Sequence, residues 1–181
     1  MSSNNNRFAS TNFITSTNNL RDILKRCKKC YKITMNASLI MPIESVSETR
    51  LPKVRFQKYF LLANFKTGEN LGHWVGIAVF PHEKLCVIID PGNRYRDYPI
   101  VVSHIQNFCK LNKLNIFDYA TKFQQDSSFI CGQLCTFFCA KIHLFSFQEL
   151  LNFRDVIKSY TISSNEENMM SFVQKHFDIS F

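Results

Sequence analysis

The sequence has no apolar run that approaches the roughly 20 residues needed to cross a bilayer. Its first six residues contain no apolar core, so we expect neither a secretory signal nor a membrane partner. It also lacks an even set of cysteines. Seven cysteines in a chain without a signal make a disulfide framework unexpected and favour a reducing compartment. A thiol retained for its reactivity fits this setting.

Metal-ligand patterns are also scarce. Cys27 and Cys30 have the spacing of half a zinc site, but no second pair at ligand spacing accompanies them. Four further residues recur at every fourth position, namely Cys131, Cys135, Cys139 and His143. On a helix each such step rises about 6 Å and rotates by about 40°, so the four cannot bind one ion. We expect no metal, and we interpret Cys135 and Cys139 as small core residues.

The chain of 181 residues is long enough for one domain with a full core, and no repeat or linker divides it. We expect a flexible polar N-terminus over residues 1–17 and a single domain over residues 18–181. The net charge of +8 favours polyanionic partners, nucleic acid first. Much of it lies on a predicted amphipathic helix over residues 18–31, at Arg21, Lys25, Arg26, Lys28 and Lys29. This basic face is either a solvated helix surface or a surface that binds DNA.

Apolar runs bounded by turn residues predict three strands, over residues 59–65, 73–80 and 85–90. Their short connections indicate an antiparallel meander. Residues 32–57 predict loops with short extended pieces, and residues 117–123 a further strand. Helical patterns cover residues 101–111, 131–144, 147–157 and 166–177. The predicted fold class is α+β, with a central, mostly antiparallel sheet flanked by helices.

Cys131 opens a predicted helix that is apolar nearly all round, as expected of a buried helix. The unpaired N–H groups and the dipole at such a helix start favour a thiolate, which is the nucleophilic form of cysteine. Gly132 removes a side chain next to the sulfur, so that a substrate backbone can approach. Gln125, six residues upstream, can donate its amide to the oxyanion that forms on attack. Gln124 is the rival, because adjacent side chains of an extended segment face opposite ways.

His73 is the predicted base, at the start of a strand, and Asp90 ends another strand 17 residues later. If these strands pair through the turn at residues 81–84, Asp90 can accept a hydrogen bond from His73 and fix its orientation. Trp74 is expected to pack near the site, as a substrate-binding residue or as a core aromatic. His82, His104 and His176 belong to no such constellation.

The set formed by His73-Trp74, Asp90, Gln125 and Cys131-Gly132 resembles the adenovirus-protease and SUMO-protease clan of cysteine peptidases. The stretch from Phe123 to Cys139, in which Cys131-Gly132 is followed by further cysteines and bulky apolar residues, looks like the viral branch. With its small size, and with a composition that suggests AT-rich coding, the chain is most similar to the maturation proteases of virophages and Polinton-type viruses. The resemblance covers roughly residues 59–143. Adenovirus proteases carry Glu where this chain has Asp90, which matches the SUMO-protease side.

The resemblance implies a papain-like α+β core with circularly reordered elements, in a monomeric cysteine protease domain. It implies cleavage of viral capsid or other structural precursors by Cys131, His73 and Asp90. No cofactor is required, although relatives of the adenovirus type are stimulated by DNA and a viral peptide. The implied location is the virion and the host cytoplasm or nucleus.

Other functions stay open at this point. The same triad serves deconjugases, or effectors that modify host proteins, which cut after the Gly-Gly tail of ubiquitin-like proteins. A chymotrypsin-like viral cysteine protease shares the order His, Asp, Cys, but the helix after Cys131 argues against that all-β class. Papain itself is disfavoured because its cysteine precedes its histidine. The alternative to an enzyme is an inactive protein that binds nucleic acid.

Overall fold

The computed structural model describes residues 20–21, 38–52, 58–67, 72–119, 122, 124, 131–142 and 146–152. The predicted polar tail over residues 1–17 and the predicted helix over residues 166–177 lie outside this part of the chain. The same holds for most of the predicted basic helix, of which only Leu20 and Arg21 are described, both as helical.

A five-stranded sheet in the order β1-β2-β3-β4-β5 forms the middle of the molecule. The strands are β1 (Ser38–Pro42), β2 (Tyr59–Lys66), β3 (Gly72–Phe80), β4 (Leu85–Ile89) and β5 (Asn115–Asp118). The three central strands form the predicted antiparallel meander, with Phe65 opposite His73 and Gly76 opposite Ile89. Their side chains are buried almost throughout, as expected of strands covered on both faces.

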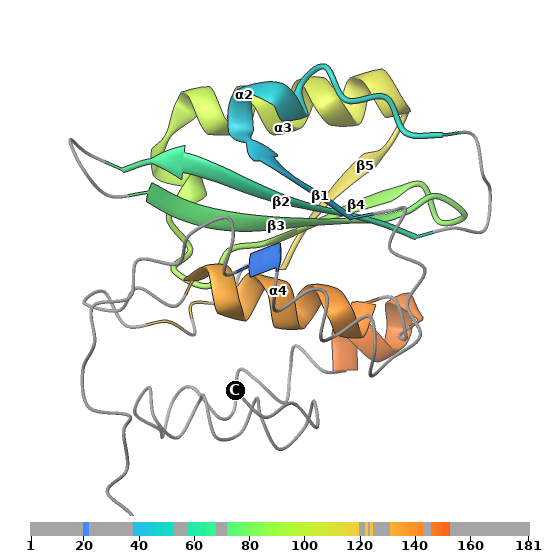
Figure 1. Cartoon of the computed structure of the whole chain (residues 1–181). Helices are drawn as coiled ribbons and strands as arrows, with labels where there is room; N and C mark the ends of the chain where they lie inside the picture. The colour runs from blue at the N-terminus through green and yellow to red at the C-terminus, as the bar shows by residue number, and fades with distance from the viewer. Residues whose placement is uncertain are drawn as a thin grey trace, which may run out of the picture.

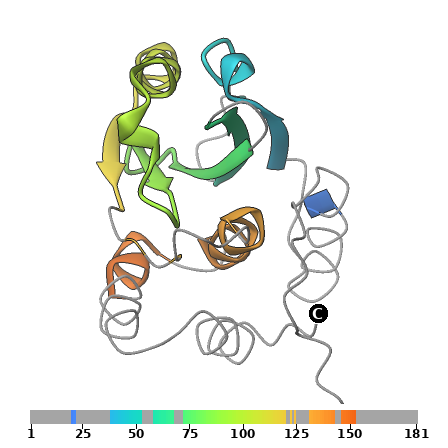
Figure 2. The same cartoon turned by 90° about the vertical axis from the view of Figure 1, so that its left-hand side faces the viewer.

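Helices cover both faces of the sheet, so the molecule has three layers (Figures 1 and 2). One face carries α2 (Ile43–Val46) and α3 (Pro99–Asn112), which share a core with alternate residues of the central strands. The opposite face carries α4 (Cys131–Ile142). Residues 147–152 are also helical, and the Phe147 ring packs edge-on against Phe80 of β3 and Phe117 of β5.

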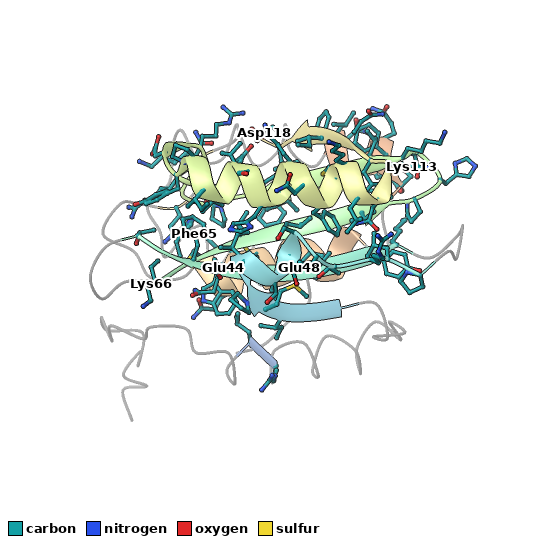
Figure 3. All side chains as sticks on the ribbon, turned by 90° about the horizontal axis from the view of Figure 1, so that it is seen from above. Glu44, Glu48, Phe65, Lys66, Lys113 and Asp118 are labelled. Carbon is teal, nitrogen blue, oxygen red and sulfur yellow. The ribbon has the colours of Figure 1, made fainter. Side chains whose placement is uncertain are left out.

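The helix α3 shows how local sequence sets an element. Pro99 stands in its first turn, where a missing N–H costs nothing, and Lys113 ends it in the left-handed region at φ 55°. Val101, Ile105 and Phe108 recur at helical spacing and are buried. Seen from above in Figure 3, α3 runs across the sheet with Lys113 at its end, and Phe65 and Lys66 lie toward the opposite end. That opposite end is where the candidate site is built.

The α+β class is confirmed, and two details differ from the prediction. The sheet is mixed, because β1 pairs with β2 and β5 pairs with β4 in parallel. Each parallel pair is joined through a helix, α2 in one case and α3 in the other, which is the connection that parallel neighbours need. The last strand is Asn115–Asp118 rather than residues 117–123. Within the part of the chain that the structure describes, no helix is both long and apolar enough to cross a bilayer.

Candidate active site

His73 lies near the start of β3, at the end of the sheet, and only 4% of its surface is exposed. Its partner across the ladder is Phe65, whose ring meets the imidazole edge-on with centroids 5.3 Å apart. The side-chain amide of Asn64 donates a hydrogen bond to the His73 carbonyl at 3.3 Å. A Cβ on Gly72 would come within 2.8 Å of that amide, so the glycine keeps the space that Asn64 occupies. Backbone and ring of His73 are thus both held.

Asp90 directly follows β4 and is buried beside His73. The pairing of β3 with β4 through the turn at residues 81–84 brings the two side chains together, as the sequence predicts. His73 Nε2 donates to Asp90 Oδ1 at 2.6 Å. Asp90 is therefore placed to fix the ring orientation and to stabilise an imidazolium.

The turn after Asp90 surrounds the carboxylate with main-chain donors. The N–H of Gly92 donates to Oδ1 at 3.0 Å, and the N–H groups of Arg94 and Tyr95 donate to Oδ2 at 2.6 and 2.7 Å. Burial alone would raise the pKa of Asp90, but the hydrogen bonds and charge of His73 and the amides of Tyr95 and Arg94 outweigh it and lower the pKa. Asp90 is consequently an anion with a fixed position.

Gly92 also touches the histidine. A Cβ at this position would lie 3.1 Å from His73 Cε1, closer than a carbon atom normally approaches another. The turn reaches this position because Asn93, with its N–H bonded to the Asp90 carbonyl at 3.0 Å, adopts φ 53°, which asparagine tolerates. The turn packs against the ring on one side while it holds the carboxylate on the other.

Cys131 begins α4 and is buried against His73. An interaction of its thiol with the His73 ring contributes to the raised pKa of that ring. Because Nε2 is bonded to Asp90, Nδ1 is the ring nitrogen left for the sulfur. The three side chains therefore form a chain of contacts from sulfur to imidazole to carboxylate.

The charge state of His73 follows from these contacts. Burial by itself would lower the pKa of the ring, but the hydrogen bonds to Asp90 and Cys131 and their negative charges outweigh it and raise the pKa to about 9. An imidazolium between a sulfur and a carboxylate is the arrangement that stabilises a thiolate, the nucleophilic form of cysteine.

The predicted oxyanion donor is less fully described, because Gln125 lies outside the described residues. The rival, Gln124, is buried, and its N–H donates to the carbonyl of Pro91 at 3.0 Å, next to Asp90. Gly132 is buried in the first turn of α4, and its carbonyl accepts from the Thr136 hydroxyl at 2.8 Å. The assignment of the glutamine therefore stays a prediction.

Trp74 is buried, with 6% of its surface exposed. Its side chain is thus accommodated in the interior, which fits the reading as a core aromatic, and a role in substrate binding stays a prediction.

Of the predicted basic face, Arg21 is exposed, while the four lysine and arginine positions that follow it lie outside the described residues. The half zinc site at Cys27 and Cys30 lies outside them too. Among the described residues, no three His, Cys, Asp or Glu side chains are grouped closely enough to hold a metal ion.

The sequence reasoning missed two groups. Pro91-Gly92-Asn93 directly follow the third predicted strand and were not predicted to belong to the site, although the Gly92 N–H donates to Asp90. The sequence reasoning treated Cys135 as a core residue, and Cys135 is indeed fully buried, yet its thiol makes polar contacts with the strands of the site. Hydrophobicity alone gives no signal for such a contact. The spacing of four residues between Cys131 and Cys135 is the only sequence signal for it.

Comparison of the chain with protein-family models finds no matching family, and comparison with curated proteins finds no match.

Proposed function

We propose that this chain is a cysteine endopeptidase that cleaves viral capsid or other virion precursor proteins. The observation that carries the proposal is the buried His73 ring, which is hydrogen-bonded to Asp90 and interacts with Cys131. The position of Cys131 at the first residue of α4, beneath a sheet whose strands present His73 and Asp90, supports a papain-like core with reordered elements. The viral substrate class rests on the resemblance in sequence.

The geometry supports a two-step acyl transfer. The Cys131 thiolate attacks the carbonyl carbon of the substrate, and the protonated His73 gives its proton to the leaving amine as the C–N bond breaks. Water then attacks the thioester, His73 takes a proton from that water, and the released acid leaves the thiolate restored. The Cys131 N–H and a glutamine amide from residues 124–125 are the proposed donors to the oxyanion.

Alkylation by iodoacetamide near neutral pH tests the nucleophile without a known substrate. We expect Cys131 to react first among the cysteines, because among those that the structure describes only Cys131 combines a helix start with a neighbouring imidazolium. His73→Ala should slow this labelling. His104→Ala on α3 is the matched control, because it removes a histidine outside the site. Faster labelling of Cys27 or Cys135 in the native protein would contradict the assignment.

Co-expression with the structural proteins encoded beside this chain tests the substrate class. New protein termini, identified by mass spectrometry, should appear with the native chain and be absent with Cys131→Ala. If the chain instead cuts only after the Gly-Gly tail of a fused ubiquitin-like protein, the deconjugase would be favoured. Asp90, in the position where adenovirus proteases have Glu, also agrees with a deconjugase.

A further inference from the structure

Cys135 lies where β3 and β4 separate. The pair Gly76 and Ile89 is the last rung of the ladder between these strands. Beyond it β3 continues along β2 to His73, while β4 ends and the chain turns at Asp90. The pairing of β3 with β4 ends at this point, whereas β3 stays paired with β2.

The thiol of Cys135 occupies this junction. Its Sγ lies 3.4 Å from the carbonyl oxygen of Trp74 and 3.5 Å from that of Ile89, and the S–H is shared between them. The backbone of Gly76 also lies near the sulfur. One side chain therefore links α4 to both strands within one residue of His73 and within one residue of Asp90.

Cys135 also shares a helix face with the nucleophile. Residues four apart on a helix lie one above the other, so Cys135 sits one turn behind Cys131. Any movement of Cys135 along or away from the sheet is passed to Cys131 through a single turn of helix. The thiol remains protonated, because burial together with the negative charges near Cys131 and Asp90 raises its pKa well above the ordinary value. It therefore keeps the S–H that its two acceptors need.

We propose that Cys135 is a positioning residue that fixes the separation between the Cys131 sulfur and the His73 ring. Its thiol ties the nucleophile helix to the carbonyls next to the other two members of the triad. A thiol is a weak hydrogen-bond donor, so its contribution here is one of placement rather than of binding strength. The inference rests on the proposed function, since it presumes that Cys131 and His73 react together.

The test compares three variants for peptide cleavage and for alkylation of Cys131. Cys135→Ala removes the sulfur, Cys135→Ser keeps a donor of nearly the same size, and Cys86→Ala removes an equally buried sulfur on the opposite face of the sheet. Misplacement of a reacting group by 1 Å can cost about 100-fold in rate. We expect Cys135→Ala to lower kcat by about 10-fold or more, with KM within about twofold.

We further expect Cys135→Ala to change the pH dependence of Cys131 alkylation, with its alkaline limb at lower pH. A longer distance between the Cys131 sulfur and the His73 ring weakens the interaction that helps His73 to keep its proton. Cys135→Ser should recover part of both losses, and Cys86→Ala should change neither, although both alanine variants lower the melting temperature. Equal rates for Cys135→Ala and Cys86→Ala would overturn the proposal. So would a serine variant no better than a folded alanine variant. If the alanine variant does not fold, Cys135→Ser is compared with the native protein, and a native rate together with a native pH profile would overturn the proposal.

Alkylation separates the two possible failures. If Cys131 of the native protein reacts slowly and His73→Ala does not change its rate, the proposed function fails, and this inference fails with it. If Cys131 reacts rapidly and depends on His73, but the Cys135 variants leave its rate and pH profile unchanged, only the positioning role is wrong.

Discussion

Gly92 contributes to the site through what it lacks. Its main-chain N–H holds Asp90 Oδ1, and the space where a Cβ would stand is bordered by His73 Cε1 at 3.1 Å. Any larger residue here must push the imidazole, which lies between the sulfur and the carboxylate. The position therefore constrains the site although it takes no part in the chemistry.

We predict that Gly92→Ala lowers kcat/KM by about 10-fold, because displacement of the ring by a few tenths of an ångström spoils its alignment with the sulfur. The melting temperature should change little. Asn93→Gly is the matched control in the same turn, since glycine adopts φ 53° freely. Steady-state kinetics of the two variants check this, and an unchanged rate in Gly92→Ala would show that the ring is less tightly held than the contact indicates.

The protonation of His73 sets a pH dependence with a defined sign. Its pKa in the fold is about 9, above the value of about 6.5 for an unperturbed histidine. The stabilisation is therefore complete below pH 6.5 and lost as the pH rises through 9. The depressed pKa of Asp90 acts in the opposite direction, because its contribution is lost as the solution becomes acidic.

We predict that the difference in free energy of unfolding between the native protein and His73→Gln shrinks between pH 6.5 and pH 9. Urea unfolding at several pH values measures it, with His104→Gln as the control for loss of an unrelated histidine.

In the same window, the rate of peptide cleavage should fall on an alkaline limb near pH 9. Asp90→Asn should move that limb to lower pH.

At the scale of elements, η2 (Tyr95–Asp97) anchors the turn that holds Asp90. The Tyr95 hydroxyl donates to Asp118 Oδ2, at the end of β5, at 2.5 Å, and Arg96 binds the same oxygen. Burial and the hydrogen bond to Asp118 raise the pKa of Tyr95 to about 12, so the hydroxyl remains a donor. The turn is thus tied to a strand outside the meander.

We predict that Tyr95→Phe lowers the free energy of unfolding by about 1 kcal/mol, the usual value of one such bond, and also lowers kcat. The second effect arises because the turn that presents three amides to Asp90 becomes looser. Tyr98→Phe is the control, since its hydroxyl makes only a 3.3 Å contact with the Thr67 carbonyl. An equal loss of activity in both variants would contradict the role of η2 in anchoring the turn that holds Asp90.

Most of the elements that carry the site could be predicted from the sequence. The strands β2, β3 and β4 stand out as apolar runs between turns, and α4 as an apolar helix after Cys131. The edge strands could not be placed in the same way. The strand β1 ends in Pro42 and has no apolar alternation that marks it, and β5 is exposed at Ile116. Their parallel pairing depends on crossover helices, which local sequence does not specify.

At the scale of the whole molecule, the three members of the proposed triad come from two layers. His73 and Asp90 belong to the sheet, and Cys131 belongs to the helix packed beneath it (Figure 1). Sequence order and strand pairing predict the contact of His73 with Asp90. The contact of Cys131 with them depends on how α4 docks, and local pattern does not determine docking. The resemblance to a known clan supplied that part of the expectation.

The basic face is the other feature at this scale, and its function stays a prediction. If it binds DNA, the affinity should fall steeply with salt, because each neutralised phosphate releases bound counterions. A double variant, Lys25→Glu with Lys28→Glu, should weaken the binding and reduce the salt slope, whereas Lys110→Glu on α3 should not. Fluorescence anisotropy with labelled duplex DNA measures this, and affinity that ignores salt would leave a solvated surface as the explanation.

The donors to Asp90 have a consequence for how this site can change over time. Of the four donors that the described part of the chain supplies, three are main-chain amides, which every residue except proline carries. Any substitution at position 94 except proline therefore keeps the N–H that binds the carboxylate. The sequence of the turn can therefore change while Asp90 stays in place. We expect conservation to be strongest at Gly92, where a Cβ would contact the His73 ring, and at Tyr95, whose hydroxyl binds Asp118.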